Sequence, residues 1–320
     1  MPTSHHKLII LGSGPAGYTA AIYAARAGLE PVLITGMQPG GQLTITTDVE
    51  NYPGYADPVQ GPWMMEQMQQ QAINCGTNII FDQIGDIDFE RFPYTLKGDG
   101  GTYTCDGLII STGASAKWLG IPSEEKYMGK GVSACATCDG PFFKNQEVVV
   151  VGGGNSAMEE ALFLAGICAK VTIIHRRDAF RGERVLQERV LNHESITVLW
   201  DSEVDEILGG EGQDGVVEAV RVLNNKSGEK TDVPAQGVFI AIGHKPNTDI
   251  FAGKLPMDDY GYIQVPAGSV TTDIPGVYAA GDVVDAVYRQ AVTAAGLGCM
   301  AALDAVRYYD QLEYNTKKSA

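Results

Sequence analysis

The chain has 320 residues, of which 23 are Lys or Arg and 39 are Asp or Glu, so its formal charge is −16. Its length suggests about two domains, and an apolar content of 44% excludes a disordered chain. The negative charge repels phosphate and argues against nonspecific nucleic-acid binding. No apolar run approaches the roughly 18–20 residues that cross a bilayer, and no secretory signal is visible. We therefore expect a cytoplasmic protein without nucleic-acid or membrane partners.

A glycine-rich turn follows the first apolar segment. Residues 7–11 lead into Gly12-Ser13-Gly14-Pro15-Ala16-Gly17, a helical pattern continues to Ala27, and a second apolar segment covers residues 31–35. This order of strand, G-x-G-x-x-G, helix and strand is typical of a dinucleotide-binding unit. Gly12 permits the tight turn, Gly14 lets the backbone approach a pyrophosphate, and Gly17 allows close helix packing. The helix N-terminus adds amide groups and a positive dipole.

The same pattern occurs again 140 residues later (152 − 12). Residues 147–151 lead into Gly152-Gly153-Gly154-Asn155-Ser156-Ala157, a helix is expected to about Gly166, and a strand covers residues 171–174. One G-x-G-x-x-G/A match is a weak signal, because a plain turn can produce it. Two matches, each between a strand and a helix, predict two dinucleotide sites.

The residues after the second strand of each unit distinguish the two cofactors. An NAD site usually carries an acidic residue there, and neither unit has one. The second unit instead has His175-Arg176-Arg177 with Arg181 nearby, and residues 170–189 hold six basic and three acidic residues, a local +3. Guanidinium groups suit a 2′-phosphate, so we predict NADPH here. A solvated basic helix face is the alternative interpretation.

The first unit ends its second strand at Thr35-Gly36, with neither an acid nor an arginine cluster. By elimination we expect FAD, the natural partner of NADPH. Two further strand ends support this interpretation, at residues 108–113 and 277–282; Asp282 could bond a ribityl hydroxyl or, alternatively, cap a turn. A helix that opens at Arg289-Gln290-Ala291 and runs to about Tyr309 could stabilise negative charge on a reduced flavin.

A C-x-x-C motif is the remaining candidate for chemistry, at Cys135-Ala136-Thr137-Cys138-Asp139. This spacing allows a disulfide and favours a reactive thiolate, and Asp139 could donate or accept a proton. A zinc site would need two more ligands, and the five histidines are scattered, so no metal is expected. A purely structural motif is the other alternative. The remaining cysteines are expected to be small core side chains: Cys75, Cys105, Cys168 and Cys299.

Taken together, these motifs resemble the low-molecular-weight thioredoxin reductases of bacteria, and the resemblance runs nearly end to end. It rests on the two glycine loops and on residues 40–44, 50–51, 135–140, 175–178, 241–244, 281–283 and 289–291. Two small departures are Pro141, shortly after the C-x-x-C motif, and Ser111, where alanine is common. Neither is a redox residue.

The resemblance implies an α/β fold with two Rossmann-like, three-layer dinucleotide-binding domains. An NADPH domain (116–245) that carries the C-x-x-C motif would be inserted into a discontinuous FAD domain (1–115 and 246–320). The expected FAD contacts are Gly12, Ser13, Gly14, Pro15, Ala16, Gly17, Thr35, Gly36, Gly41, Gln42, Asn51, Thr112, Gly113, Gly281, Asp282, Arg289, Gln290 and Ala291. The expected NADPH contacts are Gly152, Gly154, Asn155, Ser156, His175, Arg176, Arg177 and Arg181.

The resemblance also implies an activity, a homodimer and a large rotation of the NADPH domain. NADPH would reduce FAD, and FAD would reduce a Cys135–Cys138 disulfide. Cys138 would lie nearest the flavin, Cys135 would attack the disulfide of thioredoxin, and Asp139 would be the general acid and base. Two alternatives stay open: a reductase of another disulfide protein or of a one-electron carrier, and a nucleotide-binding redox sensor without enzymatic activity.

Overall fold

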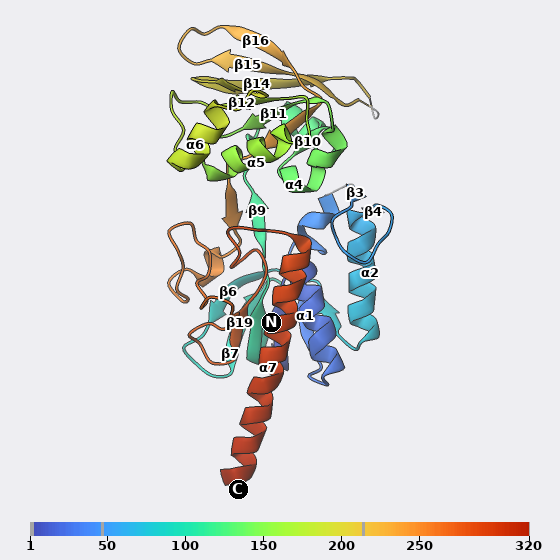
Figure 1. Cartoon of the computed structure of the whole chain (residues 1–320). Coiled ribbons are helices and arrows are strands. Elements are labelled where there is room, and N and C mark those ends of the chain that lie inside the picture. Colours follow the sequence, from blue (N-terminus) through green and yellow to red (C-terminus); the bar gives the residue numbers. More distant parts are fainter. Residues whose placement is uncertain (1–2, 46–47, 213–214, 320) are drawn as a thin grey trace. The chain divides into compact units, whose positions relative to one another are not determined.

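The structure is a computed structural model that describes residues 3–45, 48–212 and 215–319. The chain folds into two compact units (Figure 1): the first comprises Met1–Ser115 and Lys245–Ala320, and the second comprises Ala116–His244. The two segments where the chain passes between them, β9 (Ala114–Ala116) and β18 (His244–Pro246), pair as a two-stranded sheet. The second unit is thus inserted into the sequence of the first.

The first unit is built on a seven-stranded sheet in the order β5-β2-β1-β8-β7-β6, with β19 also paired to β8. The glycine-loop strand β1 runs parallel to β2 and β8, whereas β7 and β6 are antiparallel additions. The strands are β1 (Thr3–Leu11), β2 (Val32–Ile34), β5 (Asn78–Ile80), β6 (Ile84–Asp88), β7 (Tyr94–Gly98), β8 (Thr102–Ile110) and β19 (Val277–Ala279). A small hairpin contains β3 (Asp48–Val49) and β4 (Val59–Gln60).

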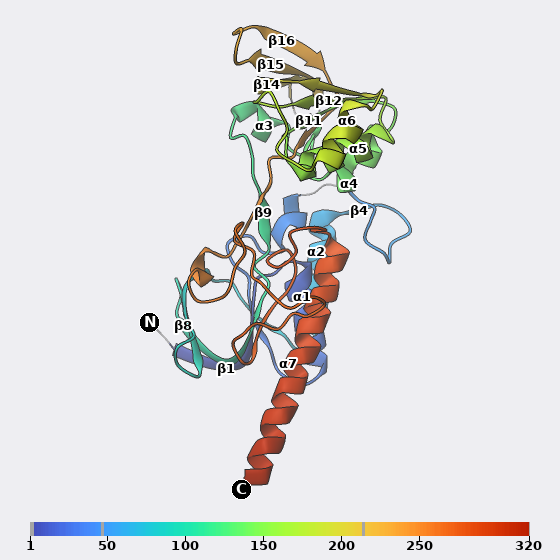
Figure 2. The ribbon, with the colours of Figure 1, turned by 60° about the vertical axis from the view of Figure 1, so that its left-hand side comes forward.

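Helices cover one face of this sheet. Because side chains alternate along a strand, Leu8 and Ile10 of β1 join the core under α1, α2 and α7, while Ile9 and Leu11 join the core on the other face. Figures 1 and 2 show α7 lying along α1. The helices are α1 (Pro15–Arg26), α2 (Gly61–Asn74) and α7 (Ala291–Ser319), with the 3-10 turns η1 (Gly41–Ile45) and η3 (Asp249–Phe251).

The predicted end of the C-terminal helix at Tyr309 is wrong, since α7 continues to Ser319. Residues 310–319 contain neither glycine nor proline, so no backbone signal ends the helix. Their polarity shows only that this part of the helix has no apolar face to bury.

The second unit is built on a five-stranded parallel sheet in the order β10-β17-β11-β12-β13. Helices α4, α5 and α6 cover one face, and the antiparallel sheet β14-β15-β16, with α3 against β14, covers the other, which gives three layers (Figure 2). The strands are β10 (Val132–Ser133), β11 (Glu147–Val151), β12 (Lys170–Ile174), β13 (Ile196–Leu199), β14 (Ser202–Gly209), β15 (Val217–Asn224), β16 (Lys230–Pro234) and β17 (Gly237–Ile240). The helices are α3 (Pro122–Lys126), α4 (Ala136–Asp139), α5 (Asn155–Ala165) and α6 (Arg184–Leu191), with the 3-10 turn η2 (Gly140–Phe143).

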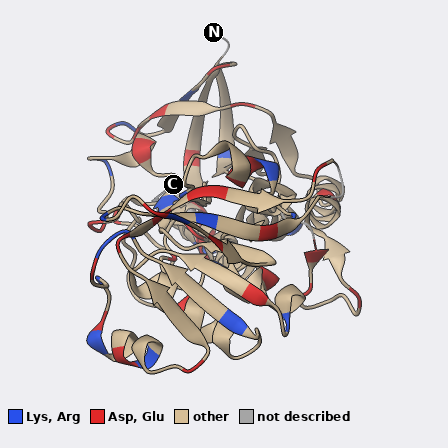
Figure 3. Ribbon diagram, turned by 90° about the horizontal axis from the view of Figure 1, so that it is seen from above, with Lys and Arg blue, Asp and Glu red and all other residues tan. Residues whose placement is uncertain are grey.

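The acidic excess is not gathered on one element. Figure 3 shows Lys and Arg interspersed with Asp and Glu along strands, helices and loops. In the part of the chain that the structure describes, no helix combines the length and apolar character that a membrane crossing requires.

Candidate active site: two glycine loops and a disulfide

The two glycine loops have the same backbone arrangement at the ends of β1 and β11. Gly12 and Gly152 both have a positive φ, of 108° and 153°. A Cβ at Gly12 would lie 2.2 Å from the carbonyl oxygen of Ser111, and one at Gly152 would lie 2.4 Å from that of Ala241. Each first glycine therefore lies against the neighbouring strand end, where no side chain fits.

The second glycine of each loop has open space instead. Gly14 and Gly154 are extended residues immediately before α1 and α5. A Cβ at either position would meet nothing within 4 Å in the described chain. Together with the helix N-termini, these open backbone segments fit the pyrophosphate of a dinucleotide in each unit.

The predicted arginine cluster follows β12. The exposed side chains of Arg176, Arg177 and Arg181 form no ion pair with any carboxylate of the described residues. The amide of Arg181 donates to the carbonyl oxygen of Gly153 at 2.9 Å, which holds this residue beside the glycine loop. The three guanidinium groups fit the 2′-phosphate of NADPH.

His175 lies in a different environment from these arginines. Its side chain is only 6% exposed, and its Nε2 lies 2.9 Å from the carbonyl oxygen of Ala179. A carbonyl can only accept, so Nε2 carries the hydrogen. The ring packs against Phe180 and Trp200. Burial lowers the pKa of His175, and the neighbouring arginines lower it further, although the Ala179 bond opposes them. The imidazole thus braces the turn that carries the arginines; its contact with NADPH stays a prediction.

Two neighbouring predicted NADPH contacts lie at the start of α5. The Oδ1 of Asn155 accepts from the amide of Glu183 at 2.8 Å, and its Nδ2 donates to the Glu183 carboxylate at 3.3 Å. Ser156 follows as a half-buried residue. Asn155 thus joins the glycine loop to the segment that contains the arginines.

In the first unit, Ser13 connects three of the segments predicted to bind FAD. Its buried hydroxyl donates to the carbonyl oxygen of Thr35 and accepts from the amide of Gly40, each at 3.0 Å. Gly41 follows, and its Cβ would lie 3.2 Å from the Cα of Gly14. The glycine loop, the end of β2 and the start of η1 therefore converge, and Gln42 lies in η1.

The turn after β19 brings the next predicted contacts close to α1. A Cβ at Gly281 would lie 2.9 Å from the Cβ of Ala16. Burial raises the pKa of the half-buried Asp282 to about 6; Asp285 adds to the rise and Arg289 opposes it. No hydrogen bond from the described residues reaches this carboxylate, so it is suited to accept one from a ribityl hydroxyl of FAD.

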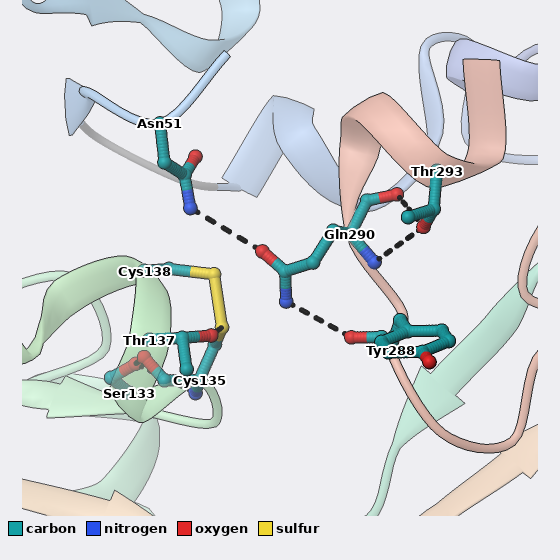
Figure 4. Close-up of a disulfide and its surroundings, with 8 residues drawn as sticks. All are labelled: Asn51, Ser133, Cys135, Thr137, Cys138, Tyr288, Gln290 and Thr293. Atoms are coloured by element: carbon teal, nitrogen blue, oxygen red, sulfur yellow. Dashed lines mark hydrogen bonds between the residues drawn. A yellow bond between two sulfur atoms is a disulfide. The ribbon is translucent and has the colours of Figure 1, made fainter. Parts of the chain in front are cut away.

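Further predicted contacts from distant parts of the sequence meet directly. The Nδ2 of Asn51 donates to the Oε1 of Gln290 at 3.3 Å, and the Nε2 of Gln290 donates to the carbonyl oxygen of Tyr288 at 3.0 Å (Figure 4). Gln290 immediately precedes Ala291, the first residue of α7. These residues therefore form one cluster in the first unit.

Thr112 and Gly113 lie at the end of β8, against the chain that returns from the second unit. The hydroxyl of Thr112 donates to the carbonyl oxygen of Asn247 at 2.8 Å, and the amide of Asn247 donates to the carbonyl oxygen of Gly113 at 2.9 Å. Ser111, one of the two departures, donates from its hydroxyl to the carbonyl oxygen of Leu11. The other departure, Pro141, occupies the first turn of η2, where proline is tolerated.

The C-x-x-C motif is closed in the second unit. Cys135 and Cys138 form a disulfide with a Cα–Cα distance of 5.3 Å (Figure 4). Cys135 caps α4, because its carbonyl oxygen accepts from the amides of Cys138 and Asp139 at 3.3 and 3.1 Å. Its sulfur also lies 3.4 Å from the hydroxyl of Thr137. Both cysteines are half-buried, so the sulfurs are held in a fixed turn without being sealed in a core.

The other four cysteines form no disulfide. The expectation of core side chains is confirmed for Cys105 and Cys168, which are buried, whereas Cys75 and Cys299 are half-buried. Across residues 3–45, 48–212 and 215–319, no three His, Cys, Asp or Glu side chains group in a way that could hold a metal ion.

Two site-forming residues escape sequence reasoning. The hydroxyl of Ser133 accepts from the amide of Cys135 at 3.0 Å, and the carboxylate of Asp285 accepts from several amides of the segment before α7. Both side chains bond amides two residues further on, a local pattern typical of Ser and Asp in turns. That pattern is the only signal that could have indicated them.

Comparison with known proteins agrees with this geometry. Residues 6–298 match the pyridine nucleotide-disulphide oxidoreductase family. The thioredoxin reductase of Rickettsia conorii is 58% identical over 306 residues, which cover 95% of this chain and 98% of that protein. The solved thioredoxin reductase from Giardia duodenalis is 41% identical with a TM-score of 0.91, over 96% of this chain and 99% of that one.

One relative carries a different name. A protein of Pseudomonas fluorescens called glucosaminate ammonia-lyase is 54% identical over 316 residues, which cover 97% of each chain. The family match nevertheless spans most of the chain, and the two thioredoxin reductases match over nearly their whole length. The chain therefore belongs to the pyridine nucleotide-disulphide oxidoreductase family, and within it to the FAD-binding, NADPH-dependent thioredoxin reductases.

Proposed function

We propose that this chain reduces the disulfide of thioredoxin with electrons from NADPH, using Cys135 and Cys138 as the reactive pair. The observation that supports this most directly is the disulfide itself, held at the start of α4 with Asp139 directly after it. The same unit contains the second glycine loop and the arginine cluster. A reducible sulfur pair and a site suited to the reductant thus occur in one unit.

The first unit, residues 1–115 with the C-terminal segment, is proposed to hold FAD. Its loop at residues 12–17, the half-buried Asp282 and the Asn51–Gln290 pair are the groups that support this assignment. The second unit, about residues 116–245, would hold NADPH through its loop at residues 152–157 and Arg176, Arg177 and Arg181. When bound, FAD supplies a two-electron centre that links NADPH oxidation to disulfide reduction.

The cysteines then perform a thiol–disulfide exchange. Once the Cys135–Cys138 bond has taken up two electrons and two protons, the Cys135 thiolate attacks one sulfur of thioredoxin, and the other sulfur leaves as a thiolate. The Cys138 thiolate next attacks the Cys135 sulfur of this mixed disulfide. That step restores the Cys135–Cys138 bond and releases thioredoxin as a dithiol. The sum is NADPH, one proton and a disulfide giving NADP⁺ and a dithiol.

Asp139 is proposed to move the protons of this exchange. A carboxyl group next to the reactive pair can protonate a leaving thiolate and accept a proton from an attacking thiol. Assignment of attack to Cys135 and of the flavin-proximal sulfur to Cys138 follows from the family resemblance. A homodimer and a cytoplasmic location are proposed on the same ground.

Replacement of either cysteine tests the proposal. Cys135→Ser and Cys138→Ser should each abolish NADPH-dependent reduction of purified thioredoxin while the protein keeps its bound flavin, measured by its visible absorbance. Cys75→Ser is the matched control, because Cys75 is half-buried and forms no disulfide; it should retain the parent rate. If both active-site variants still reduce thioredoxin at the parent rate, the mechanism is wrong.

The choice of acceptor needs a separate measurement. A panel of thioredoxin, other disulfide proteins and a one-electron carrier should show NADPH oxidation that is fastest with thioredoxin. Glucosaminate is tested as well, because the Pseudomonas fluorescens relative is called a glucosaminate ammonia-lyase, and we expect no ammonia release from it. A faster reaction with another disulfide protein would keep the disulfide chemistry and replace the proposed partner.

A further inference from the structure

Asp285 accepts a dense set of hydrogen bonds from the segment that precedes α7. Its Oδ1 accepts from the amides of Val287 and Tyr288 at 2.9 and 2.8 Å. Its Oδ2 accepts from the amide of Arg289 at 3.0 Å, and the hydroxyl of Thr293 makes a longer contact of 3.5 Å. One carboxylate thus fixes three consecutive amides.

Beside these bonds, the guanidinium of Arg289 donates to the carbonyl oxygen of Ala286 and bonds the side chain of Tyr262. Val287 and Tyr288 are 73% and 68% exposed, so hydrophobic burial does not order them. Residues 285–290 belong to no helix or strand. Arg289 has a φ of 48°, a left-handed conformation that non-glycine residues seldom adopt. Asp285 is nevertheless the group that bonds the backbone amides of three consecutive residues in this exposed segment.

The path of residues 285–290 matters because it positions Gln290. Gln290 accepts from Asn51 and donates to the carbonyl oxygen of Tyr288, whose own amide is bonded to Asp285 (Figure 4). The hydroxyl of Thr293 accepts from the amide of Gln290 at 3.3 Å and donates to its carbonyl oxygen at 2.9 Å. Two of the residues that bond Gln290, Tyr288 and Thr293, thus also contact Asp285.

We infer that Asp285 is a positioning residue for the FAD site: its carboxylate sets residues 286–290 so that Arg289 and Gln290 face the cofactor. This inference rests on the FAD-binding role proposed for the first unit. The amide of Asp285 also donates to the carbonyl oxygen of Gly281 at 3.1 Å, which links the segment to the turn that carries Asp282. The carboxylate and the backbone amide of Asp285 therefore join the turn after β19 to the segment before α7.

The electrostatics are consistent with this placement. Asp285 is the charged group that adds to the burial-induced rise in the pKa of Asp282, while Arg289 lowers it. Arg289 also lowers the pKa of Tyr262, although burial raises that pKa overall. Asp285 and Arg289 thus act with opposite sign on the carboxylate proposed to bind the flavin chain.

Two variants of the holoenzyme test the inference. Asp285→Ala removes every acceptor, whereas Asp285→Asn keeps one oxygen for Val287 and Tyr288 but cannot accept from Arg289. We expect FAD release on dilution, followed by flavin fluorescence, to be about tenfold or more faster for Ala, the size of a lost charged hydrogen bond, and intermediate for Asn. Tryptic cleavage after Arg289, identified by mass, should rise in the same order.

Asn224→Ala is the matched control in the second unit. The Oδ1 of Asn224 accepts from the amides of Lys226 and Ser227, two and three residues on, as Asp285 does. This variant should release FAD at the parent rate. If Asp285→Asn has the parent circular dichroism, FAD release and cleavage after Arg289, the inference is overturned, even where Asp285→Ala fails to fold. A parent protein without FAD would instead overturn the proposed function.

Discussion

The two glycine loops share a backbone and differ in their side chains. In both, the first glycine lies against a carbonyl oxygen of the adjacent strand end and the second faces open space. At the third position, however, Gly17 of the first unit corresponds to Ala157 of the second. The first loop tolerates no methyl group there, because a Cβ would lie 1.9 Å from the carbonyl oxygen of Gly12.

The strand ends beside the loops differ more strongly. β2 is followed by the buried Thr35, whereas β12 is followed by His175 and exposed arginines. The common backbone suits what two dinucleotides share, the pyrophosphate, and the differing ends suit what they do not share. The shared backbone thus supports a dinucleotide in each unit, and the charge at the strand end supports the assignment of NADPH to the second unit.

The largest expected effect comes from exchange of the third loop residue. Gly17→Ala places a methyl group against backbone, which cannot move without breaking the β1–α1 turn, so we expect a loss of about 3 kcal/mol or more in stability and a flavin-free protein. The reverse change, Ala157→Gly, loses one buried methyl and some helix propensity, about 1–2 kcal/mol. Urea unfolding and the flavin absorbance measure both.

The two variants are each other's control, because they alter equivalent positions by one methyl group. Equal, small losses would show that the tight contact at Gly12 is relieved by a shift of the loop. The difference between Gly17 and Ala157 would then not reflect a difference in how tightly the two loops pack.

The second prediction concerns the strand ends. Arg176→Ala combined with Arg177→Ala should weaken NADPH by about 2–4 kcal/mol, or roughly 30- to 1000-fold in KM, and barely alter NADH. Arg189→Ala, which removes a basic residue from α6 in the same positive stretch, is the control and should leave both KM values near the parent. Equal losses for NADPH and NADH in the double variant would contradict the 2′-phosphate assignment.

Sequence reasoning succeeds where a local pattern has only one structural solution. The two strand–glycine–helix units are predicted closely, because the loop residues and the apolar periodicity act within 30 residues of each other. The α/β fold with parallel sheets follows from them and is confirmed. The C-terminal helix is predicted from its start at Ala291, but its end is missed because a polar helix without glycine or proline resembles a loose tail.

Residues whose role depends on distant segments are less accessible. Nothing in a run of basic residues indicates that His175 is buried between Phe180 and Trp200 while its neighbours are exposed. Similarly, the Asn51–Gln290 contact joins residues 239 positions apart. The sequence around Asp285 is that of an ordinary turn, and only the fold shows that this turn leads to Arg289 and Gln290.

The third prediction, with an effect at the low end of the second, is a pH dependence that arises in the first unit. Folding raises the pKa of Asp282 from its ordinary value of 3.8 to about 6, mainly through burial. Between these values the folded chain binds a proton that the unfolded chain has lost. The free energy of unfolding of the flavin-free protein should therefore fall as pH rises through this window, by about 2 kcal/mol after allowance for partial exposure.

Asp282→Asn removes the titrating group and should abolish this contribution, so the flavin-free variant should be more stable than the parent at pH 7 and similar to it near pH 4. Asp57→Asn, an exposed carboxylate in the same unit, is the control and should keep the parent profile. In the holoenzyme the sign of the Asn effect should reverse, because the ionised Asp282 is the proposed acceptor for the flavin chain. An Asp282→Asn variant that is stabilised equally with and without FAD would show that this carboxylate does not bind the cofactor. The first unit would then have no charged cofactor-binding residue comparable to the arginines of the second.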